Sequence, residues 1–177
     1  MKEAFINNEI WTLTFSAAFQ RAYVYGENVD NRQKSDFKSS LRNFVETKLL
    51  PQYVSEKVAD KTHIENIYSL CTQSKNHSKI LSKGQINFGV SQKLLNLFLK
   101  YKWCLNEIVE PPHFPVDRRI QENINYPKIV SWTKFKDEKD YLEIIDFVRK
   151  NMLGHKSLAE FELDHFERRV PSSKRKK

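Results

Sequence analysis

The stretch Gly84-Gln-Ile-Asn-Phe-Gly-Val-Ser-Gln-Lys93 decides how this chain folds. It holds two of the only four glycines in 177 residues and leads directly into an apolar segment that ends at Leu105. Glycine allows tight turns, and the first N–H groups of a helix have no partner within the helix. We therefore expect a turn between Gly84 and Gly89, followed by a helix whose outward-facing N–H groups attract an anion.

The apolar segment predicts an amphipathic helix that contains Gln92 and ends near Leu105. Large apolar residues recur at helical spacing along it, namely Leu94, Leu97, Phe98, Tyr101 and Leu105. The polar residues Lys93, Asn96 and Lys100 form a second stripe. This pattern indicates one face packed on the core and one polar face.

A proline-rich segment follows this helix. Pro111, Pro112 and Pro115 disfavour helix and hold the chain extended. Asp117 then stands where a side-chain cap is needed, ahead of a helix that carries Arg118 and its neighbours. A lysine and a carboxylate are thereby predicted near the starts of two helices, facing one cleft.

Two motifs in this region resemble those of base-excision DNA glycosylases of the helix-hairpin-helix superfamily. Phe88-Gly89-Val90-Ser91-Gln92-Lys93 is similar to the second half of the hairpin, and Phe114-Pro115-Val116-Asp117 is similar to the Pro-Val-Asp that follows it. The resemblance implies a helix-hairpin-helix near residues 75–105, with Lys93 as the nucleophile that attacks the sugar and Asp117 as the assisting carboxylate. It also implies DNA contacts through backbone N–H groups and basic side chains, for which the candidates are Gly89, Val90, Ser91, Gln92, Lys83, Lys100 and Arg118.

The chain departs from that family in two respects. Ser91 stands where a second hairpin glycine is usual, and the interval between Lys93 and Asp117 is longer than in typical members. The same region also resembles an uncharacterised bacterial helical family with a Gln-Lys-x-x-Asn-x-x-x-Lys-Tyr pattern followed by His-x-Pro-x-Asp. That second resemblance implies no function.

The net charge of +8 is distributed unevenly along the chain. Six positive charges lie in residues 168–177, where there is no acidic residue, so residues 1–167 carry only +2. Between Glu65 and Glu107 there is likewise no acidic residue, and six lysines fall in that interval: Lys75, Lys79, Lys83, Lys93, Lys100 and Lys102. Such a surface attracts phosphate, although a solvated lysine-rich face would give the same pattern.

The rest of the chain predicts further helices and no strand. Capping signals occur at Ser35, at Thr62 with Glu65, and at Ser157 with Glu160. We expect an all-α fold, a single compact domain of seven or eight short helices over residues 1–169. Residues 170–177 are expected to form a disordered basic tail.

Composition excludes several classes of protein. No segment approaches the ~20 continuous apolar residues that span a bilayer, and the N-terminus lacks the apolar core of a secretory signal. The two cysteines provide neither a disulfide framework nor a metal cluster, and His63 and His113 are isolated in sequence. We expect an intracellular protein with no metal, no cofactor and no membrane contact.

Two functions of different kinds remain open at this point. The first is a DNA base-excision glycosylase, with strand-nicking lyase activity through Lys93 as an extension. The alternative is a non-catalytic helical module that binds nucleic acid or a protein partner through its lysines. A role in bacterial defence is one form of this alternative. DNA is the expected partner in the first case, and the oligomeric state is open in both.

Overall fold

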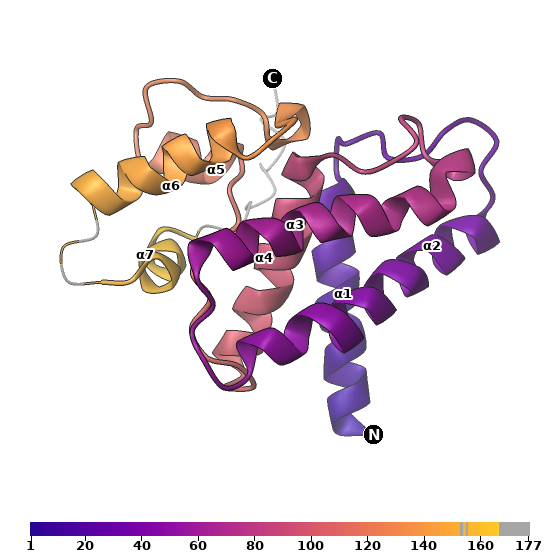
Figure 1. Cartoon of the computed structure of the whole chain (residues 1–177), viewed down its shortest axis with the longest axis horizontal. Coiled ribbons are helices and arrows are strands. Elements are labelled where there is room, and N and C mark those ends of the chain that lie inside the picture. Colours follow the sequence, from indigo (N-terminus) through magenta and orange to yellow (C-terminus); the bar gives the residue numbers. More distant parts are fainter. Residues whose placement is uncertain (153, 155, 167–177) are drawn as a thin grey trace, which may run out of the picture.

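The computed structural model describes residues 1–152, 154 and 156–166, and this part of the chain is helical (Figure 1). Its α-helices are α1 (Lys2–Phe19), α2 (Asn31–Phe44), α3 (Asp60–Ser74), α4 (Phe88–Cys104), α5 (Arg118–Asn123), α6 (Lys139–Asn151) and α7 (Leu158–His165). Shorter elements join them: the π-helical η1 (Val45–Leu49) and the 3-10 segments η2 (Leu50–Tyr53), η3 (Lys75–Ile80) and η4 (Trp132–Lys134). The all-α fold and the number of helices are confirmed.

Helix α4 lies at the centre of the molecule. In the view of Figure 1, α1 and α2 lie on one side of it and α5, α6 and α7 on the other, while α3 crosses in front. Every residue of α4 from Phe88 to Lys100 is buried, including the polar stripe that contains Lys93 and Asn96. The expectation that only one face of this helix packs on the core is therefore wrong, because other parts of the chain cover α4 on all sides.

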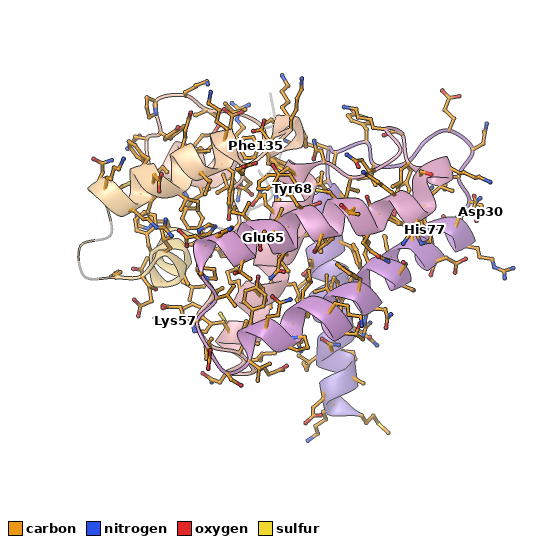
Figure 2. The ribbon with its side chains drawn as sticks, viewed as in Figure 1. Asp30, Lys57, Glu65, Tyr68, His77 and Phe135 are labelled. Atoms are coloured by element: carbon orange, nitrogen blue, oxygen red, sulfur yellow. The ribbon has the colours of Figure 1, made fainter. Side chains whose placement is uncertain are left out.

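The capping predictions have mixed outcomes. Ser157 caps α7 and Glu160 completes the predicted capping box. By contrast, α2 begins earlier than the Ser35 signal indicates, because Asp30 (Figure 2) caps it in a reciprocal pair with Gln33. Helix α3 begins at Asp60, ahead of the signal at Thr62 and Glu65, and no side chain caps it.

Helix α3 continues into η3, and a turn then leads to α4. Gly84 has a φ of 71° in this turn, a left-handed conformation that favours glycine. Gly89, in contrast, lies within the first turn of α4, and Asn87 is the cap that precedes it. Two helices joined by a turn thus occupy residues 60–104, but the turn ends before the predicted hairpin glycine.

Gly89 is required by the close approach of another segment. A Cβ atom added to it would lie 1.6 Å from the backbone oxygen of Trp132 in η4, and its N–H donates to the oxygen of Phe135 at 3.2 Å. At the same junction (Figure 2), Tyr68 of α3 packs its ring against Phe88, with ring centroids 5.1 Å apart. The segment before α6 is thus attached to the start of α4.

A chain of buried hydrogen bonds crosses the core. The Tyr53 hydroxyl lies 2.8 Å from Nδ1 of His63, and Nε2 of His63 lies 3.0 Å from Oδ1 of Asn96. Nδ2 of Asn96 donates to the Tyr141 hydroxyl at 3.0 Å, and this hydroxyl lies 2.9 Å from Nδ1 of His113. All five side chains are essentially inaccessible to solvent, so each needs the partner it has.

The donor and acceptor of each hydrogen bond follow from the side-chain amide of Asn96, whose oxygen accepts and whose nitrogen donates. Oδ1 of Asn96 can only accept, so Nε2 of His63 carries the proton and Nδ1 accepts from Tyr53. By the same reasoning, Tyr141 donates to Nδ1 of His113, whose Nε2 lies 3.1 Å from the carboxylate of Asp60. Burial lowers the pKa of both histidines, so both rings are neutral in the folded protein.

Gly89→Ala should destabilise the fold by about 3 kcal/mol or more, because the added methyl group overlaps backbone that cannot move without separating η4 from α4. Urea unfolding followed by circular dichroism measures this loss. Gly26→Ala is the matched control, since the nearest atom to its added Cβ is 3.8 Å away. Its stability should change by no more than about 1 kcal/mol. Equal effects of the two substitutions would contradict the close approach at Gly89.

Acidification should destabilise the protein below about pH 6.5. The pKa values of His63 and His113 are lower in the folded chain than in the unfolded chain, so the unfolded chain binds more protons in this range. The free energy of unfolding should fall by up to about 1.4 kcal/mol per pH unit for each histidine. The pKa of Asp60 is lowered, first by its hydrogen bond with His113, so this carboxylate adds a loss in the same direction at lower pH.

Urea unfolding at several pH values between about 7 and 5 tests this dependence. His63→Gln should reduce the slope, whereas His77→Gln, outside the buried chain, should keep it. Stability that is constant over this range would show that the two buried histidines are not neutral.

Candidate functional site

Lys93 and Asp117 are brought together as expected. Nζ of Lys93, on α4, lies 3.0 Å from Oδ2 of Asp117, 24 residues further along the chain. The other oxygen of Asp117 caps α5 by accepting from the backbone N–H groups of Arg119 at 2.9 Å and Ile120 at 3.2 Å. One carboxylate therefore starts a helix and binds an ammonium group.

Gln92 holds the chain immediately before Asp117 against α4. Its side-chain amide donates to the backbone oxygen of Val116 at 2.7 Å and accepts from the Val116 N–H at 3.1 Å. This two-way contact fixes the residue that precedes Asp117, while α4 fixes Lys93 next to Gln92. The prediction of Gln92 as a DNA contact is wrong, because its side chain is fully buried in this contact.

Trp132 forms the floor beneath the lysine. Nζ of Lys93 lies 3.9 Å from the centroid of the Trp132 ring, a cation–π contact that adds to the ion pair. Burial lowers the pKa of Lys93 below its usual value, and the negative charge of Asp117 opposes that effect. The side chain of Lys93 is only 7% exposed, whereas that of Asp117 is 27% exposed and opens toward solvent.

Lys93 and Asp117 line a cleft of about 630 Å³ between the end of α1, α4, α5 and η4. Its described lining carries four cationic side chains and two carboxylates, the cations being Arg21, Lys93, Arg118 and Arg119 and the acids Asp117 and Glu122. Arg118 is exposed and pairs with Glu122 at 2.7 Å. The cleft is thus cationic, with an ion pair at its base.

A smaller cavity of about 110 Å³ adjoins the cleft and shares Lys93 and Asp117 with it. Its wall includes Glu162 of α7, whose Oε1 lies 3.0 Å from Nζ of Lys100. Burial raises the pKa of Glu162, while Lys100 favours the ionised form. Two carboxylates, each paired with a buried lysine, therefore flank this cavity.

The predicted anion site at the start of α4 is wrong. The N–H of Gly89 donates to Phe135, that of Val90 to the side chain of Asn87 at 3.0 Å, and that of Ser91 to the Asn87 backbone at 3.0 Å. All three residues are buried. These groups cannot bind a phosphate because the chain itself has used them.

The predicted lysine-rich face is wrong for three of its six members. Lys93, Lys100 and Lys102 are buried, and each forms an ion pair, the last with Glu107. Lys100 also lies 3.8 Å from the centroid of the Phe166 ring. Lys83 is exposed in the turn before α4, as a DNA contact would require. The predicted basic tail of residues 170–177 lies outside the described residues.

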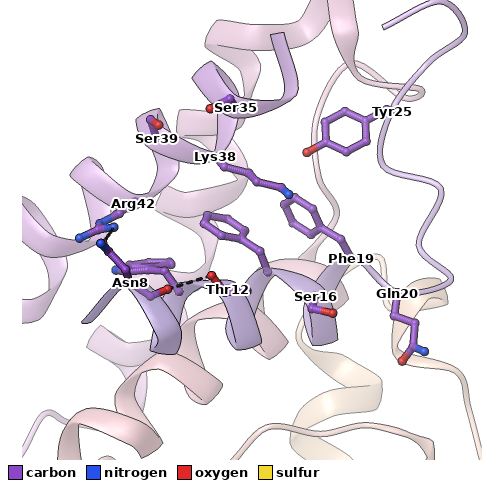
Figure 3. A pocket seen from close by; sticks show the side chains of 12 residues that line it. Asn8, Thr12, Ser16, Phe19, Gln20, Tyr25, Ser35, Lys38, Ser39 and Arg42 are labelled. Carbon is purple, nitrogen blue, oxygen red and sulfur yellow. Dashed lines mark hydrogen bonds between the residues drawn. The ribbon is translucent and has the colours of Figure 1, made fainter. Parts of the chain in front are cut away.

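A second hollow, which the sequence did not indicate, lies between α1 and α2 (Figure 3). Its volume is about 620 Å³, and its described lining contains aromatic rings, hydroxyl groups, Lys38 and Arg42 but no carboxylate, histidine or cysteine. It therefore lacks the paired groups of acid–base or nucleophilic chemistry. The cleft of Lys93 and Asp117 is accordingly the candidate for a reaction.

Two kinds of site are not found in the described part of the chain. No group of three or more His, Cys, Asp or Glu side chains there is arranged to hold a metal ion. None of its helices combines the length and apolar character needed to cross a membrane.

Comparison with known proteins adds no relative. No known protein family matches this chain, and neither a curated protein nor a solved structure is significantly similar to it.

Proposed function

We propose that the cleft of Lys93 and Asp117 binds the phosphate backbone of DNA. The observation that carries this proposal is the collection of four cationic side chains around one cleft that has only two carboxylates. Arginine guanidinium groups present a planar set of donors that suits phosphate oxygens. Three of the four cations are arginines.

The position of each group supports a role in binding a backbone. Arg21 follows the end of α1, and Arg118 and Arg119 begin α5, so the arginines come from two different parts of the chain and line the same cleft as the ion pair. The Arg118 side chain is 64% exposed and can exchange Glu122 for a phosphate. Because exposed ion pairs contribute little to stability, this exchange costs little.

Replacing Arg118 or Arg21 by Ala should weaken DNA binding by roughly threefold to tenfold at any sequence, because each variant loses a phosphate contact. The slope of log affinity against log salt should decrease by about 1 for each. Fluorescence anisotropy with a short labelled duplex over a series of salt concentrations measures both quantities. Arg32→Ala, an exposed arginine on α2 outside the cleft, is the control and should change neither. Equal losses in all three variants would refute binding at this cleft.

A second function, excision of a base from DNA with lyase activity, is favoured by the 3.0 Å contact between Lys93 and Asp117. The Lys93 amine, once neutral, would attack C1′ of a deoxyribose while the bond from C1′ to the base breaks. Asp117 would accept the proton from the amine and pass it to the departing base. The lowered pKa of Lys93 supports this role, whereas the attraction of Asp117 for the ammonium form opposes it.

Trapping with borohydride tests the second function. A Lys93 nucleophile forms a Schiff base with the sugar, so reduction should leave a covalent adduct on a duplex with a damaged base. Lys93→Gln should abolish the adduct, whereas Lys102→Gln, which removes another buried and paired lysine, should retain it. Asp117→Asn should slow base release and also destabilise the protein, because it leaves the buried ammonium group of Lys93 without its carboxylate, although the amide oxygen can still cap α5. Thermal unfolding of each variant separates the two effects.

If folded wild-type protein forms no adduct on a broad panel of damaged duplexes, the enzyme proposal fails and the DNA-binding proposal is unaffected.

A further inference from the structure

The groove between α1 and α2 has an aromatic floor and a polar rim. Its volume of about 620 Å³ lies within the range typical of small-molecule sites. Trp11, Phe15 and Phe19 come from one side of α1 and line it, and the rings of Trp11 and Phe15 contact one another with centroids 5.1 Å apart. Such a floor suits a flat apolar body.

Two polar groups at one end of the groove lack a partner. One is a hydroxyl group without a hydrogen bond, and the other is an ammonium group without an ion pair. In Figure 3 the Lys38 ammonium and the Tyr25 hydroxyl lie toward the same end of the groove, beside Phe19. The hydroxyl of Tyr25 is buried and unpaired, and within the described residues Lys38 forms no ion pair. Nζ of Lys38 lies 5.9 Å from the centroid of Phe15, over the aromatic floor.

The lining defines the charge of a ligand. It includes Lys38 and Arg42, and among the described residues it includes no Asp or Glu. Arg42 is occupied by Glu46 at 3.1 Å and by Asn8 at 2.6 Å, which leaves Lys38 as the available cation. The hydroxyls of Ser35 and Ser39, on the same helix as Lys38, add further donors at the rim.

We propose that this groove binds a small aromatic carboxylate, with its ring on the floor formed by Trp11, Phe15 and Phe19 and its carboxylate between Lys38 and the Tyr25 hydroxyl. The carboxylate supplies the acceptor that Tyr25 lacks and the negative charge that Lys38 lacks. This site lies between α1 and α2, and the residues that would hold the ligand do not line the cleft of Lys93, with which the groove shares Gln20; the proposal therefore does not depend on the proposed DNA binding.

Naphthalene-1-acetate and its neutral amide form a matched pair of probes, because they share the ring and differ in charge. Isothermal titration calorimetry with the wild-type chain should show at least tenfold tighter binding of the acid. This comparison requires no substitution, so it stands even if a variant fails to fold. Equal affinity for the two probes, or no binding of either at millimolar concentration, would overturn the proposal.

Variants then locate the site. Lys38→Gln and Tyr25→Phe should each weaken binding of the acid by about fivefold to tenfold and leave binding of the amide unchanged. Lys48→Gln, an exposed lysine on η1 outside the groove, is the charge-matched control and should have no effect. Arg118→Ala should also bind the acid normally. A loss in Arg118→Ala without a loss in Lys38→Gln would assign the acid to the DNA cleft and refute a site between α1 and α2.

Discussion

The structure depends on the burial of one helix that is not apolar. Helix α4 is covered on all sides, yet it carries three lysines, an asparagine and a glutamine that are nearly inaccessible to water. A buried charge or amide is costly unless another group replaces its water. The polar side chains of α4 therefore need partners from other elements, and those partners determine where α3, α5, α6 and α7 lie around α4.

Much of this arrangement could be predicted from the sequence, but the burial of polar groups could not. The helical periods, the cap at Asp117 and the capping box at Ser157 depend on neighbouring residues, and such signals survive in a linear sequence. The proximity of Lys93 and Asp117 was predicted because the prolines limit the path between them. The stripe of Lys93, Asn96 and Lys100 was predicted to form a polar face outside the core, because periodicity alone cannot distinguish a solvated polar face from one that meets complementary groups.

The same limit explains the errors at the start of α4. Gly89 was expected to open a turn and to expose backbone N–H groups, yet its lack of a side chain serves the contact with Trp132. That contact joins residues 43 positions apart, so no local pattern reports it. Likewise, Gln92 is an ordinary helix residue in the sequence, and its two bonds with Val116 appear only when the proline-rich segment is placed against α4.

The buried chain from Tyr53 to His113 has one further property, which arises from its single direction. All four hydrogen bonds donate in the direction of His113, so their dipoles are aligned, and Nε2 of His113 lies 3.1 Å from the Asp60 carboxylate, which Arg149 contacts at 2.6 Å. No member can rotate or change tautomer alone without bringing two donors or two acceptors face to face. The network is consequently an all-or-none element, and the ionisation of a half-exposed carboxylate at one end selects, through Tyr141 and Asn96, the tautomer of His63 three residues further along α3.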